Sequence, residues 1–379
     1  MRVLLTGGGT GGHIYPALTI ANRLKERIVG VRLLYVGTRD GLEADLVPRE
    51  GIPFETITVR GLLGKTPVQL LSGFFAAARG CAQSYRIVRR FRPDVVVGTG
   101  GYVCGPVVLV AALCRIPILL QEQNAFPGLT NRALARFASV VAVPFDDTRS
   151  YFPRRTRVVV TGNPVRPQIL SQDRAAAARA LGLDPDKLTL FVFGGSRGAK
   201  SINQAMIGAV RTLLSRKGLQ ILYVTGREYF HWVTKELEGQ GIGKERYGNL
   251  SIVPYLYQVE KAWATTDLVV SRAGGMTLAE ICALGIPAVL IPSPNVANDH
   301  QRANAQAVAR HGGAVVLDDR DLNGELLART VVAILDEPGR LAVMAEASRA
   351  VGRPRATDDL VDWVQRLSRG RSKGLKGVE

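Results

Sequence analysis

Two glycine-rich turns are the parts of this sequence best suited to bind a phosphorylated ligand. The first, Gly7–His13 (GGGTGGH), follows the apolar run Arg2–Thr6, and the second, Gly194–Ala199 (GGSRGA), follows Leu188–Phe193. When a strand leads through such a turn into a helix, bare backbone N–H groups lie at the positive end of that helix. Each turn is therefore predicted to seat a phosphate, and the pair indicates two nucleotide-type domains facing a cleft.

A third segment, Ser271–Glu280 (SRAGGMTLAE), runs from a predicted strand into a predicted helix. Its glycines would let a diphosphate approach the helix start, and Glu280, one turn further, could accept hydrogen bonds from both hydroxyls of a ribose. Asn298–Asn304 (NDHQRAN) follows with amides suited to sugar hydroxyls. The alternatives are a Glu280 on a solvated helix face and a helix cap made by Asn298 or Asp299.

The first turn also matches the dinucleotide fingerprint G-x-G-x-x-G, which leaves a nicotinamide dehydrogenase as an alternative. That fingerprint needs an acidic residue at the end of the second strand to bind the ribose. Here the second predicted strand ends at Gly37 and is followed by Thr38 and Arg39, with Asp40 arriving late. An arginine at this place would suit a 2′-phosphate, so the motif alone does not decide between the two classes.

The elements that must position these turns are short apolar strands alternating with helices. Their hydrophobicity is continuous rather than alternating, which predicts strands covered on both faces, as in the parallel sheets of α/β proteins. The fold class is therefore α/β, with two Rossmann-like doubly wound domains. The further predicted strands are 31–37, 54–59, 94–98, 116–121, 140–144, 157–161, 219–225, 250–254, 267–271, 286–292 and 314–317, and the predicted helices are 16–25, 203–214, 277–284 and 301–309.

A chain of 379 residues is too long for one ordinary core, so two domains are expected. Two prolines interrupt regular structure in Gly162–Pro167, which marks the boundary. We predict an N-terminal domain over 1–163 and a C-terminal domain over 164–345. Residues 346–379 would form a C-terminal helix, with its packing on the N-terminal domain left open, and a basic tail in which 368–376 are disordered.

The composition is that of a globular protein, with 46% hydrophobic and 21% charged residues and a net charge of +17. Such a charge favours an anionic partner, although it could simply aid solubility. No nucleic-acid-reading motif is present, and the aromatic content of 6% is low. The four cysteines form no CxxC pair, which indicates reduced thiols in a cytosolic protein. The longest apolar stretch, 106–120, contains Arg115 and Pro117 and is shorter than the roughly 20 residues that span a bilayer.

Seven sequence blocks follow one another in order over most of the chain. They are Gly8–His13, Gly98–Pro106 (GTGGYVCGP), Glu122–Asn131 (EQNAFPGLTN), Gly162–Arg166 (GNPVR), Gly194–Ala199, Ser271–Glu280 and Gln301–Ala305. Together they resemble the MurG family of peptidoglycan N-acetylglucosaminyltransferases, which are two-domain (GT-B) enzymes. The departure is Gln121, where a histidine is expected before Glu-Gln-Asn in many relatives.

The resemblance implies transfer of GlcNAc from UDP-GlcNAc to the C4 hydroxyl of MurNAc in undecaprenyl-pyrophosphoryl-MurNAc-pentapeptide, with inversion, as a step of peptidoglycan synthesis. It places most of the nucleotide on the second domain and the acceptor pyrophosphate at the glycine loops of the first. The implied donor-binding residues are Thr10, Gly11, Gly12, Asn124, Arg166, Ser196, Leu256, Gly275, Met276, Thr277, Glu280, Gln301 and Asn304. The implied acceptor-binding residues are Gly11, Gly12, Gly100, Gly101, Tyr102 and Asn131.

A single inverting displacement needs a base for the attacking hydroxyl and stabilisation of the departing UDP. His13 is the leading candidate, because a helix N-terminus favours the neutral ring. Its alternative role is a helix-start hydrogen bond, and Glu122 is the second candidate base. No metal or other cofactor is expected, since helix dipoles and Arg166 can stabilise UDP. The Asp-x-Asp spellings Asp184–Asp186 and Asp319–Asp321 are interpreted as turns and caps rather than as metal sites.

Apolar residues beside a basic cluster suggest shallow insertion into an anionic bilayer, with ordinary helix packing as the alternative. We therefore expect a peripheral protein on the cytoplasmic face of the cell membrane, and other cell-wall synthesis proteins are left open as partners. A UDP-GlcNAc 2-epimerase-like enzyme is the alternative function. The apolar residues are Leu62, Leu63, Leu70, Leu71, Phe74 and Phe75, and the basic ones are Arg60, Lys65, Arg79, Arg86, Arg89 and Arg90.

Overall fold

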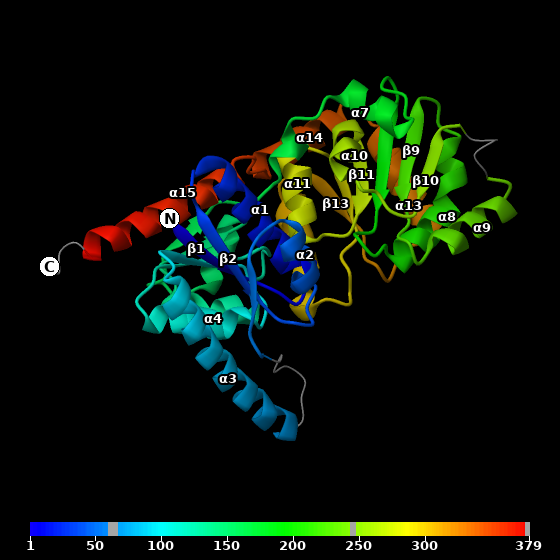
Figure 1. Cartoon of the computed structure of the whole chain (residues 1–379). Helices are drawn as coiled ribbons and strands as arrows, with labels where there is room; N and C mark the ends of the chain where they lie inside the picture. Colours follow the sequence, from blue (N-terminus) through cyan, green and yellow to red (C-terminus); the bar gives the residue numbers. More distant parts are fainter. Residues whose placement is uncertain (60–66, 243–247, 376–379) are drawn as a thin grey trace. The chain divides into compact units, whose positions relative to one another are not determined.

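The structure is a computed structural model that describes residues 1–59, 67–242 and 248–375. The chain divides into two compact units, Met1–Pro164 with Arg355–Glu379, and Val165–Pro354 (Figure 1). Residues 346–354, which the sequence suggested for the C-terminal segment, belong to the second unit. They do so because helix α14 (Arg340–Val351) packs against α11 (Gly275–Leu284) of that unit.

The first unit is built on a parallel sheet of seven strands in the order β3-β2-β1-β4-β5-β6-β7. Its strands are β1 (Arg2–Thr6), β2 (Arg32–Gly37), β3 (Phe54–Thr56), β4 (Val95–Gly98), β5 (Ile118–Gln121), β6 (Val140–Val143) and β7 (Val158–Val160). Its helices are α1 (Gly11–Arg27), α2 (Glu43–Arg49), α3 (Pro67–Phe91), α4 (Cys104–Leu113), α5 (Leu129–Leu134), η1 (Ala135–Phe137), η2 (Asp146–Tyr151) and α15 (Ala356–Leu375).

The second unit is built on a parallel sheet of six strands in the order β10-β9-β8-β11-β12-β13. Its strands are β8 (Leu188–Phe193), β9 (Leu219–Val224), β10 (Leu250–Val253), β11 (Leu268–Ser271), β12 (Ala288–Leu290) and β13 (Ala314–Val316). Besides α11 and α14, its helices are α6 (Pro167–Leu170), α7 (Arg174–Leu181), α8 (Lys200–Leu214), α9 (Phe230–Gly239), α10 (Val259–Thr265), η3 (Ala297–Asp299), α12 (His300–Ala309) and α13 (Gly324–Asp336).

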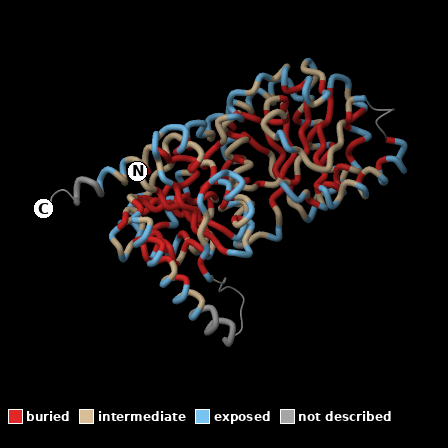
Figure 2. The backbone as a smooth tube through the Cα atoms, viewed as in Figure 1, coloured by how far each residue is buried: buried red, intermediate tan, exposed pale blue. Residues whose placement is uncertain are grey.

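Both sheets are buried on both faces, as their continuous hydrophobicity predicted (Figure 2). Along β1, Val3 and Leu5 face a core made with α1, α2 and α15, whereas Leu4 faces a core made with α3, α4 and α5. In the second unit α8, α9 and α13 cover one face, and α6, α7, α10, α11 and α12 cover the other. Helix α14 contributes to both cores, with Met344 in the first and Val351 in the second. The prediction of two doubly wound parallel-sheet units is confirmed.

The end of the chain returns to the first unit as α15. Leu360, Val361 and Val364 are buried against α1, and Arg23 of α1 forms an ion pair of 2.8 Å with Asp358. The expectation of disorder over 368–376 is wrong for 368–375, because α15 continues to Leu375.

Candidate functional site

In each sheet, the two central strands end at the same level. Thr6 of β1 pairs with Gly98 of β4, and Ser271 of β11 pairs with Phe193 of β8. In both sheets the strand order reverses between these two strands, so a topological switch point lies at their carboxyl ends. Ligands of open α/β sheets bind at such points. The structure thereby brings each predicted glycine loop next to a second loop of its own unit.

In the first unit the loops after β1 and β4 touch backbone to backbone. The Gly8 N–H donates to the Gly100 carbonyl at 3.3 Å, and a Cβ added at Gly101 would lie 2.2 Å from the Gly8 carbonyl oxygen. Gly101 also has φ +82°, a region that favours glycine. A side chain at Gly101 would therefore push the two loops apart, which explains why GTGGY accompanies the first turn.

His13 is the third residue of α1 and is half-buried beside these loops. Its Nδ1 lies 3.0 Å from the carbonyl oxygen of Thr99 and 2.9 Å from Oε1 of Gln123. The Thr99 hydroxyl in turn donates to the His13 carbonyl at 2.6 Å. One edge of the imidazole is thus fixed to the first unit, and the ring stands at the helix start where the sequence placed a base.

Glu122 is buried, and its carboxylate accepts five hydrogen bonds from residues 123–131, which form the loop after β5 and the start of α5. Oε1 accepts from the backbone N–H groups of Gln123 and Asn124, both at 2.9 Å, and from the Asn124 amide at 3.2 Å. Oε2 accepts from the Gly128 N–H at 3.0 Å and from the Asn131 amide at 2.9 Å. Since these donors occupy the oxygens of Glu122, the geometry favours His13 over Glu122 as the base.

The remaining predicted residues of the first unit differ in exposure. Thr10 and Gly12 are exposed and Gly11 is half-buried, while Tyr102 is exposed and lies beside Gly9. Asn131 is buried, and its amide donates to Glu122 and to the Gln121 carbonyl. As it stands, Asn131 supports the Glu122 loop rather than facing a ligand.

Glu43, a buried carboxylate under the first turn, was not predicted from the sequence. Its Oε1 accepts from the N–H and hydroxyl of Thr38 at 3.0 and 2.6 Å, and its Oε2 accepts from the Gly9 N–H at 3.3 Å. A dinucleotide site needs an acidic group open to a ribose here. Glu43 is instead bonded to the turn and to Thr38, so it is not open to a ribose, and the dinucleotide interpretation is left with the exposed Asp40.

In the second unit the loops after β8 and β11 lie at the switch point, each leading into a helix N-terminus. Ser196 is exposed in the first of these loops, ahead of α8, and Gly275, Met276 and Thr277 begin α11. Two helix starts with bare N–H groups converge on one edge of the sheet. Such an arrangement suits a diphosphate.

Two residues predicted for one ligand are paired with each other. Arg166 Nη2 lies 3.2 Å from Oε1 of Glu280, and the Trp263 indole N–H donates to Oε2 at 2.8 Å. Burial raises the pKa of the Glu280 carboxyl above its ordinary value, and the charge of Arg166 and the Trp263 bond partly offset this. Arg166 remains about half exposed, so its guanidinium is accessible to an anion.

Three other predicted residues follow the ends of β10 and β12. Leu256 is half-buried in the loop before α10, and Gln301 of α12 accepts the Ser293 N–H at 2.9 Å. Asn304 is buried, and its amide donates to the Ala273 carbonyl at 3.1 Å. Asn304 thus fixes the loop ahead of α11, whereas Leu256 and Gln301 lie closer to the surface.

An ion pair that the sequence did not reveal joins the loops of this edge. Arg272 pairs with Asp319, donates to the Ser201 hydroxyl at 2.8 Å, and donates to the Ile291 and Pro292 carbonyls at 3.1 and 3.3 Å. Ser201 donates to Asp319 at 2.6 Å. Arg272 therefore ties together the segments that follow β8, β11, β12 and β13, which are far apart in sequence.

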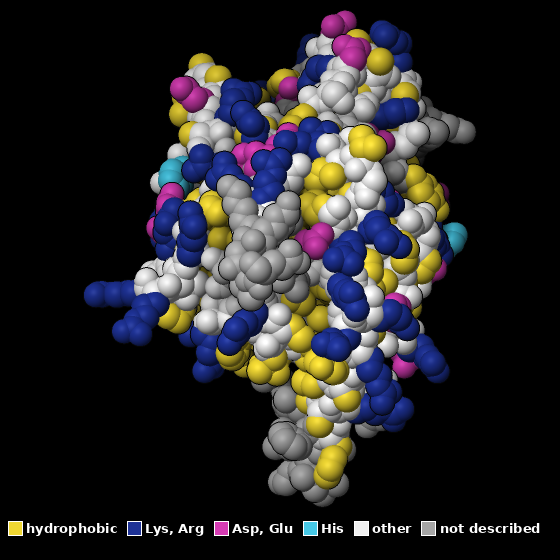
Figure 3. Space-filling view, turned by 60° about the vertical axis from the view of Figure 1, so that its left-hand side comes forward, with side chains coloured by type: hydrophobic (Ala, Val, Ile, Leu, Met, Phe, Trp, Pro, Cys, Tyr) yellow, Lys and Arg dark blue, Asp and Glu magenta, His cyan; other side chains and the backbone are white. Residues whose placement is uncertain are grey.

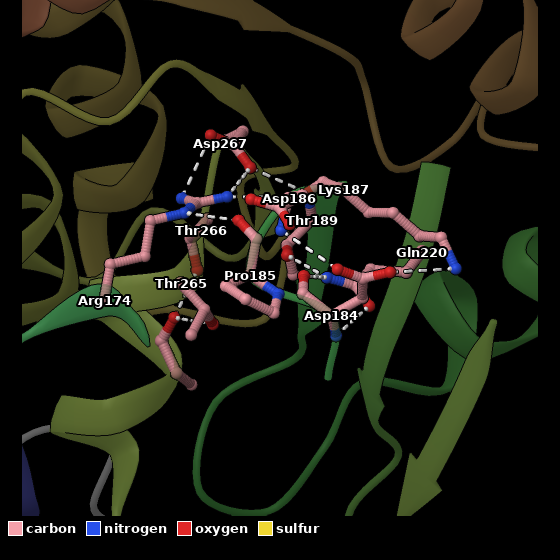
Figure 4. Close-up of polar contacts among 11 residues, drawn as sticks. Arg174, Asp184, Pro185, Asp186, Lys187, Thr189, Gln220, Thr265, Thr266 and Asp267 are labelled. Carbon is pink, nitrogen blue, oxygen red and sulfur yellow. Dashed lines mark hydrogen bonds and ion pairs between the residues drawn. The ribbon is translucent and has the colours of Figure 1, made fainter. Parts of the chain in front are cut away.

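The other Asp-x-Asp spelling lies at the opposite, amino edge of the sheet (Figure 4). Asp184 accepts the Asp186 N–H at 3.0 Å and pairs with Lys187, and both contacts hold the pKa of its carboxyl below the ordinary value. Nearby, Arg174 forms a two-pronged pair with Asp267 at 2.8 and 3.1 Å. Both Asp-x-Asp segments contain turn residues, as interpreted, and Asp319 is in addition the ion-pair partner of Arg272. Among the described residues no cluster of three metal-binding side chains occurs.

Much of the predicted membrane patch lies outside what the structure describes, including residues 60–66 and the side chains of 67–74. Phe75 of α3 is 67% exposed, and Arg79, Arg86, Arg89 and Arg90 are exposed along the same helix. Figure 3 shows basic side chains beside hydrophobic ones in the lower part of the view, toward which α3 extends. Over the described residues, none of the helices has the length and apolarity required to cross a bilayer.

Two doubly wound units with glycine loops at both switch points are the architecture of the two-domain GT-B fold, and the family matches give its class as glycosyltransferase. Residues 3–143 match the N-terminal domain of glycosyltransferase family 28, and residues 189–360 match its C-terminal domain. The UDP-N-acetylglucosamine–N-acetylmuramyl-(pentapeptide) pyrophosphoryl-undecaprenol N-acetylglucosamine transferase of Desulforamulus reducens is 48% identical over 367 residues, which cover 97% of this chain and 99% of that protein. The chain belongs to this MurG family of N-acetylglucosaminyltransferases.

Solved structures agree with this assignment. Acinetobacter baumannii MurG is 29% identical with a TM-score of 0.78, over 96% of this chain and 99% of that one. The UDP-GlcNAc 2-epimerase from Neisseria meningitidis, solved with UDP-GlcNAc bound, is 14% identical with a TM-score of 0.66, over 97% of this chain and 100% of that one. The epimerase likeness concerns the fold alone.

The Arg272 ion pair predicts a local effect that a matched pair of variants can isolate. Arg272→Ala and Arg174→Ala each remove a partner of a largely buried aspartate, so each should lower the free energy of unfolding by about 2–4 kcal/mol. Only Arg272→Ala should speed amide hydrogen exchange in 194–199 and 271–275, because Arg174 lies at the other edge of the sheet. Denaturant unfolding and exchange mass spectrometry measure both. Equal exchange in the two variants would contradict the role given to Arg272.

Proposed function

We propose that this protein transfers GlcNAc from UDP-GlcNAc to the C4 hydroxyl of MurNAc in undecaprenyl-pyrophosphoryl-MurNAc-pentapeptide, inverting the anomeric centre. The observation that carries the proposal is the pair of switch-point edges, each lined by the glycine loops of the family, in a chain 48% identical to a transferase named for this reaction. The Neisseria meningitidis epimerase shares the fold at 14% identity, and a likeness at that level does not support epimerase activity in this protein.

For the donor, the proposal assigns the nucleotide to the carboxyl edge of the second sheet. The diphosphate binds at the starts of α8 and α11 with Ser196 and Arg166, since N–H groups and a guanidinium are suited to phosphate oxygens. Glu280 accepts from the ribose hydroxyls and the Leu256 backbone contacts the uracil edge. Gln301 and Asn124 are assigned to the sugar, with Asn304 supporting from its buried place behind the loop ahead of α11. Thr10, Gly11 and Gly12 are assigned to the donor as further contacts, and Gly275, Met276 and Thr277 line the start of α11.

For the acceptor, the proposal assigns the pyrophosphate to the loops after β1 and β4. Gly11, Gly12, Gly100, Gly101 and Tyr102 would line this place, with Asn131 supporting it from the buried side. The helix start of α1 offers the same anion-binding N–H groups as α8 and α11 do. A lipid pyrophosphate fits the chemistry of this edge.

In the reaction, the C4 oxygen forms a bond to the anomeric carbon while the bond from that carbon to the UDP oxygen breaks. The hydroxyl proton passes to His13, and the charge that develops on UDP is stabilised by Arg166 and the helix starts. No metal is required in this scheme. Phe75 and the basic residues of α3 support docking on an anionic bilayer at the cytoplasmic face of the membrane. Other cell-wall synthesis proteins at that face are the partners left open by the proposal.

Purified protein with UDP-GlcNAc in EDTA should release UDP only when the lipid-linked MurNAc-peptide is added, and a disaccharide product should appear. The two tubes, with and without acceptor, are compared by UDP release and mass spectrometry. UDP release without acceptor would instead indicate an epimerase-like or hydrolytic enzyme. Activity only after magnesium addition would contradict the metal-independent scheme.

His13→Ala should lower kcat by about 10²- to 10⁴-fold, the usual contribution of a general base, while the donor KM changes less than about threefold. His231→Ala, an exposed histidine of α9, is the matched control and should leave both constants unchanged. Steady-state kinetics at saturating acceptor make the comparison. Near-normal turnover in His13→Ala would remove His13 from the mechanism.

The donor KM should rise as pH falls from 8 toward the ordinary carboxyl range. The reason is that burial raises the pKa of Glu280, so as the pH falls the carboxylate takes up a proton at a higher pH than an exposed glutamate does. The protonated group has fewer acceptors for the ribose hydroxyls. In Glu280→Gln the donor KM should be about tenfold or more higher at pH 8 and should lose this dependence. A wild-type donor KM that is flat with pH, or an unchanged KM in the variant, would dismiss the ribose contact.

A further inference from the structure

Three buried side-chain amides form a chain that ends on His13. Gln121 and Gln123 stand at and just after the end of β5, and Asn163 follows β7. Their exposed fractions are 0%, 2% and 4%. Buried amides are costly unless hydrogen-bonded, so the orientation of each is set by its neighbours.

The contacts of Gln123 leave it one orientation. Its Nε2 lies 2.7 Å from the Thr99 carbonyl, 2.9 Å from the Gln121 carbonyl and 2.5 Å from Gln121 Oε1. All three neighbours are oxygens, so only the NH₂ end can face them, since an oxygen there would repel each of them. The Oε1 end of Gln123 therefore points to His13.

Gln121 and Asn163 secure that orientation. The Oε1 atom of Gln121 accepts a hydrogen bond from Gln123 Nε2. Its Nε2 atom donates to the Glu122 carbonyl at 2.9 Å and to Asn163 Oδ1 at 2.8 Å. Asn163 closes the loop by donating to the Gln123 carbonyl at 2.8 Å. A neutral histidine at 121 would offer one donor and one acceptor, and a charged one no acceptor. The amide supplies both kinds of group at every pH at which the protein is folded.

Two hydrogen-bond acceptors face the same nitrogen, Nδ1, of His13. The Thr99 carbonyl and Gln123 Oε1 both face Nδ1, and neither can donate, so the proton of the neutral ring must reside on Nδ1. We propose that Gln123, oriented by Gln121 and Asn163, is a positioning residue that holds His13 in the Nδ1–H tautomer and leaves Nε2 as the basic nitrogen. The inference rests on the proposed function for its catalytic meaning, because Nε2 then takes the proton of the acceptor hydroxyl.

The arrangement resembles the catalytic triad in logic and differs from it in charge. In a triad a carboxylate holds the histidine tautomer and stabilises the imidazolium. Here a neutral amide fixes the tautomer without placing a negative charge against the ring, and the Glu122 carboxylate nearby is already bonded to its own loop. The positive charge that His13 acquires with the proton is thereby left to the substrate phosphates to stabilise, since the start of α1 disfavours a cation.

The first test is the nitrogen NMR spectrum of the wild-type protein labelled with ¹⁵N-histidine, which reports four rings. At pH 8 we expect His13 Nδ1 to show the shift of a protonated nitrogen and Nε2 that of an unprotonated one, with the signals assigned from the spectrum of His13→Ala. The reverse pattern in the wild-type protein would overturn the proposal without any variant of the amides.

The second test compares Gln123→Leu with Gln220→Leu. Gln220 is a buried amide of the second unit that bonds to Asp184 and to the Thr189 hydroxyl, so its loss costs similar hydrogen bonds far from His13 in sequence (Figure 4). Gln123→Leu should mix the two tautomers of His13 and lower kcat about 10- to 100-fold, with the donor KM within about twofold. Gln220→Leu should lose stability and leave the His13 signals in place.

A His13 spectrum and a kcat that Gln123→Leu leaves unchanged would overturn the inference. If Gln123→Leu fails to fold, Gln121→Leu removes the support of Gln123 without touching His13 and should shift the same signals part of the way. Wild-type protein that lacks transferase activity but shows the Nδ1–H pattern would contradict the proposed function alone. Active wild-type protein with the reverse pattern would contradict the inference alone.

Discussion

In each sheet the two central strands end at residues that pair with each other, and this register is the constraint on which the rest of the site depends. Because Thr6 pairs with Gly98 and Ser271 with Phe193, the loops that follow start side by side. They can then pack backbone to backbone, as at Gly8 and Gly101, and present helix starts to the same edge. Anion binding therefore follows from topology, and the side chains add selectivity to a place that the sheet has already prepared.

Charges buried near these edges hold the loops in place. Glu43 and Glu122 bond to backbone N–H groups of the first unit, and Arg272 bonds to carbonyls of the second. Each of these groups satisfies loop atoms that have no strand or helix partner. Arg166 and Glu280, by contrast, bond to each other, and the guanidinium remains accessible to an anion. Some buried charged groups therefore hold the loops in place, whereas the Arg166 guanidinium is available to a ligand.

The sequence was sufficient to predict the strands, the parallel sheets and the glycine loops, because hydrophobic runs and glycine spacing are local signals. It also led to His13 and Glu280. It could not reveal the Arg272–Asp319 pair, the buried Glu43 or the amide chain through Gln123, since their partners lie far away in sequence and only the folded units bring them together. Polar composition suggested disorder over 368–375, yet α15 continues there from a segment anchored by Leu360 and Val364.

The most direct measurement is a crystal structure of the protein with UDP-GlcNAc bound. The account predicts the diphosphate within hydrogen-bond distance of the loop 194–199 and of the start of α11, with Glu280 on the ribose. Nucleotide bound instead to the first turn, 7–12, would contradict this division of labour between the two sheets. It would restore the dinucleotide interpretation of that turn.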